Sequence, residues 1–328
     1  MSDFSGWIPM RIDWEGPRPM VDWGWLGNRR LIEPFFEQSI ARCVHHPADV
    51  LFRHQTSLDE LAALAPTQPS ATPKGFIFHM SRCGSTLLTQ MLAASPRNLV
   101  LSEPSPIDTV LRAHFHNPEI TEAQRVQWLQ DLVRILAWRR HPEAENLFIK
   151  FDCWHTPALP LIHRAFPGVP WIFLYREPVE VMASQGRQLG GQMIPGVLEP
   201  GWFGWEAATV NQMARHEYGA RTLAAICSAA LAQIKPGGGR LVNYRQLPAA
   251  VWPALLAYWR VEFSAEDQAH MLAVAARNAK NPVLPFDPDS QAKRDSVSPE
   301  IREITRQWLS DVYEQLEARR EREGFATA

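Results

Sequence analysis

The sequence predicts an α/β fold, a three-layer sandwich in which a central, mainly parallel sheet is flanked by helices. From Gly75 onward, short apolar runs alternate with longer segments that carry apolar residues at helical spacing. Such repeated alternation gives a parallel sheet with helices on both faces. The run Pro170–Tyr175 (PWIFLY) is apolar throughout, which indicates a central strand buried on both faces.

A Trp- and Pro-rich segment precedes this alternating region. We therefore divide the chain into an N-terminal extension, residues 1–72, and an α/β domain, residues 73–328. In the extension, one helix is expected from Glu33 to near Val44, and another begins at Ser57, which forms a capping box with Glu60. The stretch 66–73 has the composition of a linker. Packing against the main domain or at a subunit contact is the expected role of the extension.

Within the α/β domain the expected elements follow in chain order. Strands are expected at 76–78, 98–101, 146–151, 170–175 and, as the final strand, 240–244. Helices are expected from Leu87, at 121–140 with Thr121 and Gln124 as its cap, at 156–166, through Met182 and Ser184, at 202–233, and after Ser298-Pro299. A Gly- and Pro-rich loop is expected at 190–201. Because functional groups gather at the carboxyl ends of parallel strands, polar residues at those ends are the candidates for chemistry.

Composition excludes several classes of protein. The formal net charge of −2 gives no overall attraction to nucleic acid. No apolar run approaches the roughly 20 residues of a membrane span, and the N-terminus lacks the pattern of a signal peptide. The four cysteines show no CxxC pairing, and the pair His45-His46 has no third ligand spaced nearby. A cytoplasmic protein without a structural metal is expected, and its oligomeric state, homo-oligomer included, is left open.

The stretch Gly75–Leu92 (GFIFHMSRCGSTLLTQML) combines a buried strand, a tight small-residue loop and a helix N-terminus. The free N–H groups and the dipole of such a helix favour phosphate or sulfate. The loop is not a Walker A motif, since GxxxxGK[ST] is absent and Lys74 precedes the strand. A cysteine phosphatase is excluded as well, because the position six after Cys83 is Thr89 rather than Arg.

The loop Ser81–Leu88 (SRCGSTLL) resembles the 5′-phosphosulfate loop of sulfotransferases that use 3′-phosphoadenosine 5′-phosphosulfate (PAPS), commonly P-[RK]-S-G-[ST]-T. Ser81 and Cys83 replace the usual Pro and Ser, and Cys83 loses a hydroxyl donor. The resemblance covers roughly residues 75–316 and implies a P-loop NTPase-like fold of the sulfotransferase type. It assigns PAPS contacts to Ser81, Arg82, Cys83, Gly84, Ser85 and Thr86.

A second motif, Tyr175–Ser184 (YREPVEVMAS), strengthens the resemblance. In this family a strand ends in Arg-[DN]-P, and a Ser follows eight residues after the Arg; both bind the 3′-phosphate. Arg176 and Ser184 match that spacing. An Arg at a strand end offers a bidentate fork, and a Ser on the next helix presents a hydroxyl to the same phosphate. Two phosphate motifs of distinct type suit a nucleoside that carries phosphates at both ends.

The resemblance also implies catalytic residues. Glu103 closes the second strand, as does the catalytic Glu of tyrosylprotein and several bacterial sulfotransferases, and could take the proton of an acceptor hydroxyl or amine. Arg82 is expected beside it, holding its pKa low. Lys150 ends the next strand, where family members contact the transferring sulfate. Asp152, with His155 behind it, is the second candidate for the base.

The remaining positions carried over from the family concern the nucleotide. Tyr244 ends the last expected strand, as a Tyr near the nucleotide does in several members. Lys293 and Arg294 are placed in a C-terminal loop like the basic loop that closes over the 3′-phosphate, although the family's RKG pattern is absent.

The predicted function is transfer of a sulfuryl group from PAPS to a hydroxyl or amine of an unidentified, small-molecule acceptor, with no metal required. The segments 107–120 and 190–201 are expected to line the acceptor pocket. The alternatives are a P-loop-like small-molecule kinase and a catalytically idle nucleotide-binding protein.

Overall fold

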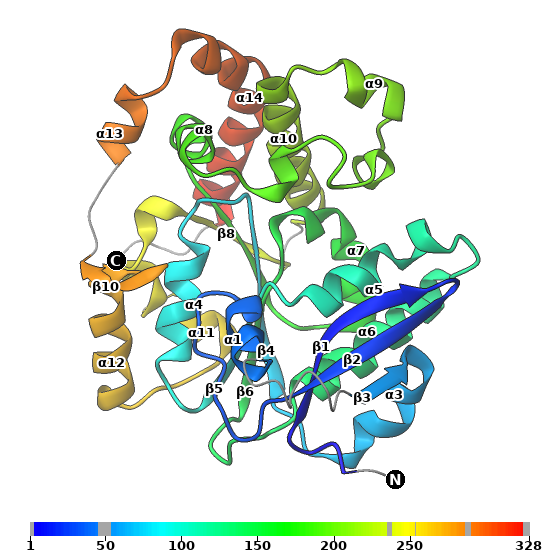
Figure 1. Cartoon of the computed structure of the whole chain (residues 1–328). Coiled ribbons are helices and arrows are strands. Elements are labelled where there is room, and N and C mark those ends of the chain that lie inside the picture. Colours follow the sequence, from blue (N-terminus) through cyan, green and yellow to red (C-terminus); the bar gives the residue numbers. More distant parts are fainter. Residues whose placement is uncertain (1–2, 45–53, 235–237, 253, 286–289, 324–328) are drawn as a thin grey trace.

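The computed structural model (Figure 1) describes residues 3–44, 54–234, 238–252, 254–285 and 290–323. Its centre is a five-stranded, fully parallel sheet in the order β5-β6-β4-β7-β8. The strands are β4 (Thr72–His79), β5 (Asn98–Ser102), β6 (Asn146–Lys150), β7 (Trp171–Tyr175) and β8 (Arg240–Asn243). The predicted fold class is confirmed.

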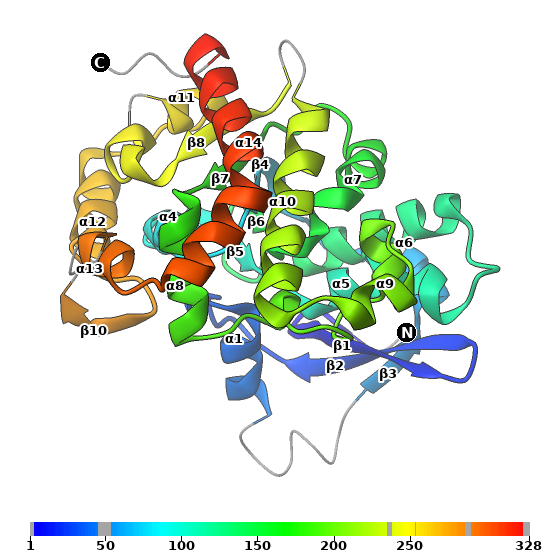
Figure 2. The same cartoon turned by 90° about the horizontal axis from the view of Figure 1, so that it is seen from above.

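Helices cover both faces of the sheet. In Figure 2 the helices α4, α11 and α12 lie on one side of the strands, and α5, α6, α7 and α10 lie on the other, while α14 packs on α8, α10 and β8. Their bounds are α4 (Ser85–Ala93), α5 (Ser105–His116), α6 (Glu122–Leu136), α7 (Leu159–Ala165), α8 (Pro178–Arg187), α10 (Arg215–Gln233), α11 (Leu255–Trp259), α12 (Ala265–Ala275), α13 (Ser290–Asp295) and α14 (Pro299–Glu323). Short 3-10 helices follow β6 (Cys153–Ala158) and β8 (Tyr244–Gln246).

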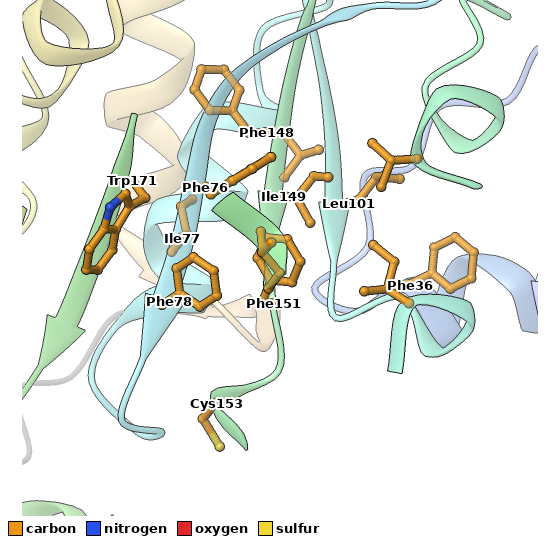
Figure 3. Close-up of a cluster of buried hydrophobic side chains, with 14 of the residues drawn as sticks. Phe36, Phe76, Ile77, Phe78, Leu101, Phe148, Ile149, Phe151, Cys153 and Trp171 are labelled. Atoms are coloured by element: carbon orange, nitrogen blue, oxygen red, sulfur yellow. The ribbon is translucent and has the colours of Figure 1, made fainter. Parts of the chain in front are cut away.

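The apolar strands form the core of the protein, and every residue of β6 and β7 is buried. Figure 3 shows buried side chains of β4, β6 and β7 packed together, with Phe78 beside Phe151. The rings of Phe78 and Phe151 are stacked with their centroids 4.7 Å apart, and Trp171 meets Phe78 edge-on at 5.9 Å. This rigid packing fixes the strand ends on which the candidate site residues lie.

The N-terminal extension contains a sheet that the sequence prediction missed. Strands β1 (Trp7–Glu15), β2 (Arg18–Trp25) and β3 (His54–Ser57) pair antiparallel, and β1 packs on α5. The alternation of Ile8, Met10 and Ile12, all buried, was the overlooked period-two signal. The expected helix at 33–44 is present as α1 (Phe36–Cys43), and α3 (Leu58–Leu64) begins at the predicted capping box. The pair at 45–46 lies outside the described residues, and the division at residue 72 stays a prediction.

Several other element predictions were wrong. The linker at 66–73 instead contains the end of a 3-10 helix (Ala65–Thr67) and the start of β4. The interior position predicted for 170–175 is not among the errors, since β7 is buried throughout and pairs with both β4 and β8, although β4 holds the middle place in the order. The helix at 202–233 is broken into a 3-10 helix (Pro200–Phe203), α9 (Ala207–Gln212) and α10, because Gly204 adopts a φ of 73° and the backbone is extended at Met213 and Ala214.

Two further differences bear on the site. Part of the expected loop 190–201 is a 3-10 helix (Gly191–Met193), and the start of the helix expected at 156–166 belongs to the 3-10 helix Cys153–Ala158. The strand at 240–244 is not the final one. A hairpin follows it, formed by β9 (Arg277–Asn278) and β10 (Asn281–Pro285).

Candidate active site

The five parallel strands bring polar residues to one edge of the sheet. A cavity of about 470 Å³ opens there. It is lined by His79 at the end of β4 and by Glu103, Asp152, Arg176 and Tyr244, which follow β5, β6, β7 and β8. Each strand of the sheet therefore contributes to one concave site, as a parallel α/β sheet predicts.

The loop between β4 and α4 forms one wall of this cavity. Ser81 and Arg82 have φ values of 79° and 51°, which are strained for residues with a side chain, and Gly84 has a φ of 86°. A Cβ atom at Gly84 would lie 2.8 Å from Cδ2 of Tyr244, so only glycine fits. The strained path ends at Ser85, where α4 begins and where the first helical N–H groups have no partner within the helix.

Cys83 points away from the cavity. Its Sγ donates to the carbonyl oxygen of Leu174 at 3.2 Å, and its side chain is fully buried. Burial raises the pKa of the Cys83 thiol to about 12, so the thiol is neutral. Cys83 therefore ties the loop to β7.

Glu103 is held by two partners below the cavity. Its Oε1 lies 3.1 Å from Nζ of Lys150 and 3.3 Å from Nε2 of His79. The N–H of Ser81 donates to Nδ1 of His79, so the ring proton sits on Nε2 and faces the carboxylate. Burial by itself would raise the pKa of Glu103, but the charge of Lys150 and the contact with His79 lower it to about 2.

The position of Arg82 corrects one expectation. Its guanidinium donates to the backbone oxygen of Gln188 at 2.5 Å and to Oε1 of the same residue at 3.2 Å. It therefore reaches across the cavity mouth to the end of α8. Lys150 and His79, rather than Arg82, are the main groups that lower the pKa of Glu103.

Lys150 lies under the floor of the cavity with a fully buried side chain, and its Nζ is 3.5 Å from Oγ1 of Thr86. A buried ammonium between the loop and a carboxylate makes the floor positive toward the loop and negative toward Glu103. The floor is therefore suited to an anionic group next to the loop and to a proton-donating group next to Glu103.

Asp152 and His155, the second candidates for the base, differ from Glu103 in their environment. Burial, followed by the charges of Glu103 and Asp108, raises the pKa of Asp152 well above its usual range. His155 is fully buried, accepts the N–H of Asp152 at Nδ1 and turns Nε2 to Oδ1 of Asp108 at 2.8 Å. Asp152 lines the cavity in a form that favours the neutral acid, whereas His155 supports the wall behind it.

Asp108 organises the wall next to this pair. It accepts from Nε1 of Trp154 at 2.7 Å and pairs with Arg112 at 2.9 Å, and Arg112 grips Glu199 with two bonds of 2.9 Å. Of the two segments expected to line an acceptor pocket, residues 190–192 reach the cavity. Among the described residues, none from 107–120 lines it, because α5 lies behind the cavity wall and contacts it through Asp108, which binds His155 and Trp154.

The second motif of the sequence also reaches the cavity, next to the ring of Tyr244 that lies against Gly84. Arg176 is buried, and its guanidinium lies 4.0 Å from the ring centroid of Tyr244. It donates to Glu180 at 2.6 Å and to Oγ of Ser290 at 2.8 Å. Arg176, Tyr244 and Ser184 all line the cavity.

Lys293 and Arg294 lie in helix α13, not in a loop. Lys293 lines the cavity, whereas Arg294 is outside its lining and pairs with Glu180 at 3.2 Å. The helix separates the two side chains because consecutive helical residues point in different directions.

Several lining residues were missed from the sequence. His79 carried a signal, because it ends the strand before the loop. Phe35 and the hairpin residues Arg277, Asn278, Ala279 and Lys280 carried none, since they reach the cavity from distant segments. In the described part of the chain, no group of three or more His, Cys, Asp or Glu could hold a metal ion. No described helix has the length and apolar character needed to cross a membrane.

A loop that leads into a helix N-terminus and a buried arginine, both at the carboxyl edge of one parallel sheet, are typical of the class of α/β proteins that bind phosphate-like anions at strand ends. Within that class, a model of the sulfotransferase family matches residues 73–252, more than half of the 328-residue chain. The chain belongs to the sulfotransferase family. It is a transferase whose reaction class is sulfuryl transfer.

Solved structures of sulfotransferases are similar only at a distance. The sulfotransferase STF9 from Mycobacterium avium is 11% identical, with 77% of this chain and 79% of that chain covered and a TM-score of 0.47. The sulfotransferase domain from the curacin biosynthetic pathway is 14% identical, with 78% and 99% covered and a TM-score of 0.44. The domain from the Synechococcus PCC 7002 olefin synthase is 17% identical, with 77% and 96% covered and a TM-score of 0.40. No curated protein matches the chain. The family assignment therefore rests on the matched segment 73–252.

Proposed function

We propose that the chain transfers the sulfuryl group of PAPS to a hydroxyl or amine of a small-molecule acceptor. The observation that carries the proposal is one cavity that contains two candidate anion sites of different kind together with an ionised carboxylate. The loop Ser81–Thr86 forms the first site, and Arg176 with Ser184 forms the second. A nucleoside with a phosphosulfate at its 5′ end and a phosphate at its 3′ end needs one anion site for each of these groups.

The residues of the cavity suit the proposed donor. Gly84 leaves room beside Tyr244 that a Cβ would fill, so the loop backbone can approach a phosphate closely. The first-turn amides of α4 and the hydroxyls of Ser85 and Thr86 supply donors for the 5′ end. Arg176 and Ser184 supply a fork and a hydroxyl for the 3′-phosphate.

The proposed transfer breaks the bond between sulfur and the bridging oxygen of the 5′-phosphate and forms a bond from sulfur to the acceptor oxygen or nitrogen. Glu103 takes the acceptor proton and later passes it to water, and adenosine 3′,5′-bisphosphate leaves with the bonding electrons. Glu103 suits the role of base because it is ionised at neutral pH, whereas the raised pKa of Asp152 favours its protonated form. Arg82, Lys150 and the loop amides stabilise the charge on the sulfuryl and leaving oxygens.

Calorimetry with adenosine 3′,5′-bisphosphate and with Mg²⁺-ATP tests the proposal without knowledge of the acceptor. We expect the bisphosphate to bind and ATP to bind at least tenfold more weakly, since the chain has no Walker lysine. Arg176→Ala should weaken bisphosphate binding by about 1.5–3 kcal/mol, the contribution of a charged hydrogen bond. Arg187→Ala, which changes an exposed arginine at the end of the following helix α8, is the matched control.

Preferential binding of ATP would favour the kinase instead. Equal bisphosphate affinity in the Arg176 and Arg187 variants would remove Arg176 from the 3′-phosphate site. Turnover of PAPS with a panel of small hydroxyl and amine acceptors then separates an enzyme from an idle binding protein.

A further inference from the structure

Several residues of the cavity come from outside the matched segment 73–252, among them Phe35 and Lys280. Phe35 precedes α1 in the N-terminal extension, and Lys280 lies in the turn between β9 and β10. Both line the cavity that contains the loop and Glu103. Segments far apart in the chain therefore meet over one end of the site.

The two residues are joined through the ring of Phe35. Nζ of Lys280 lies 5.6 Å from the ring centroid, and Nζ of Lys150 lies 4.6 Å from it. Both distances are within the range of cation–π attraction. One aromatic ring thus holds a second ammonium near the ammonium that pairs with Glu103.

The environments of the two lysines differ. Lys150 is fully buried and has Glu103 as its counter-ion. Lys280 lies at the exposed rim of the cavity, and within the described ranges its ammonium makes no ion pair with a carboxylate. Partial burial, followed by the positive charges of Arg82 and Lys150, lowers the pKa of Lys280 to about 8. An ammonium that has no carboxylate in an ion pair with it and lies near the positive charges of Arg82 and Lys150 is suited to bind an anion from solution.

The location of Lys280 selects one end of the proposed donor. Lys280 shares the ring of Phe35 with Lys150, whose Nζ lies 3.1 Å from Oε1 of Glu103 and 3.5 Å from Oγ1 of Thr86. The ammonium therefore belongs with the transferring group rather than with the 3′-phosphate.

We propose that Lys280, seated on the ring of Phe35, contacts the sulfuryl group of bound PAPS and caps the site from outside the matched segment. The proposal rests on the proposed function, since it assumes that PAPS occupies the cavity. Lys280 would act as a catalytic residue that supplies up to three N–H donors to the sulfuryl oxygens. Phe35 would act as a positioning residue for it.

A comparison of two ligands isolates this contact. PAPS and adenosine 3′,5′-bisphosphate differ by the sulfuryl group, and both carry negative charge at the 5′ end. Long-range attraction by Lys280 is similar for the two ligands and largely cancels in the ratio of their dissociation constants. What remains in the ratio is the direct contact with the sulfuryl group.

The experiment measures both dissociation constants by calorimetry, without acceptor and at fixed ionic strength, for the full-length wild type and three lysine variants. In Lys280→Gln the affinity for PAPS should fall by about tenfold more than the affinity for the bisphosphate, as expected for a lost charged hydrogen bond. Lys280→Arg should retain most of the preference. Lys74→Gln, at the opposite end of β4, is the matched control and should change neither constant.

Phe35 is tested by the same ratio. Phe35→Leu should lower the PAPS preference by less than Lys280→Gln does, and Phe35→Tyr, which keeps a ring for the cation, should restore it. Thermal denaturation of each variant verifies that it is folded. A purely structural role for Phe35 would weaken both ligands equally.

Each outcome decides the matter. An equal loss of both ligands in Lys280→Gln would place Lys280 on the nucleotide and overturn the proposal, and so would unchanged binding of both. If the wild type binds neither ligand, the proposed function itself fails. If the wild type binds both and Lys280→Gln leaves their ratio unchanged, this inference alone fails.

Discussion

Replacement of Glu103 by glutamine removes the carboxylate that pairs with Lys150 while its size and hydrogen-bonding oxygen are kept. In the folded protein Nζ of Lys150 lies 3.1 Å from Oε1 of Glu103, and the lysine side chain is 0% exposed. With an effective dielectric constant of about 20, charges at that distance attract by about 5 kcal/mol. Part of this attraction only offsets the cost of removing both charges from water, so the whole figure does not appear as stability.

Loss of one partner from a buried pair typically costs about 3–5 kcal/mol, because the remaining charge stays buried without a counter-ion. Glu103 is 21% exposed, so water in the cavity can replace part of its effect. We therefore expect Glu103→Gln to lower the free energy of unfolding by about 3 kcal/mol, the lower end of that range.

Urea denaturation followed by tryptophan fluorescence measures this loss, since the chain has 13 tryptophans. Glu145→Gln is the matched control, because the pair of Glu145 with Arg97 is about half exposed and its loss should cost less than about 1 kcal/mol. The double variant Glu103→Gln/Lys150→Met removes both charges and should recover most of the stability. A Glu103→Gln variant no less stable than Glu145→Gln would refute the reasoning.

Three further predictions follow from single residues. Gly84→Ala should lower the free energy of unfolding by about 1–3 kcal/mol and weaken bisphosphate binding, as thermal denaturation and calorimetry would show. Gly168→Ala is the control and should leave binding unchanged, because Gly168 has a similar φ of 82° but its Cβ would meet nothing within 4 Å. Arg294→Ala should change bisphosphate affinity by less than about threefold in calorimetry, because this half-exposed side chain lies outside the cavity lining; a tenfold loss would restore it to the binding site. In the folded protein the environment of Asp108 lowers its pKa from 3.8 to about 2. The ionised carboxylate therefore stabilises the folded state by about 2 kcal/mol above about pH 4, and this stabilisation is lost as the pH falls toward 2. Asp108→Asn should therefore show a shallower loss of stability between pH 4 and 2 in urea denaturation, and a slope equal to that of the wild type would contradict the assignment.

Two motifs of the site could be predicted from the sequence because each consists of consecutive residues. The strand–loop–helix stretch around Gly84 and the strand-end motif around Arg176 each fix their geometry through neighbours in the chain. The capping boxes at Ser57 and Thr121 were predicted for the same reason and are present. By contrast, the extension's strands were missed because its Trp and Pro content obscured a short alternating pattern.

The partners of Glu103 required the register of the sheet. Parallel pairing places Ser102 opposite Lys150, so the residue after Ser102 meets the end of β6. Arg82 was expected in that place because it lies in the neighbouring loop. Its strained backbone turns the guanidinium toward Gln188 instead, and no pattern of residue types reports such a direction.

By itself, the sequence determined the fold class, the two anion motifs and the strand ends on which the candidate residues lie, because hydrophobic period and turn chemistry act over a few residues. The tertiary structure decided which residues meet at those ends. Lys150 and His79 meet Glu103 through strand pairing, and Phe35 and Lys280 arrive from the two sides of the matched segment. Such contacts depend on how distant segments pack together, and packing complementarity is a property of the assembled surfaces rather than of any stretch of chain.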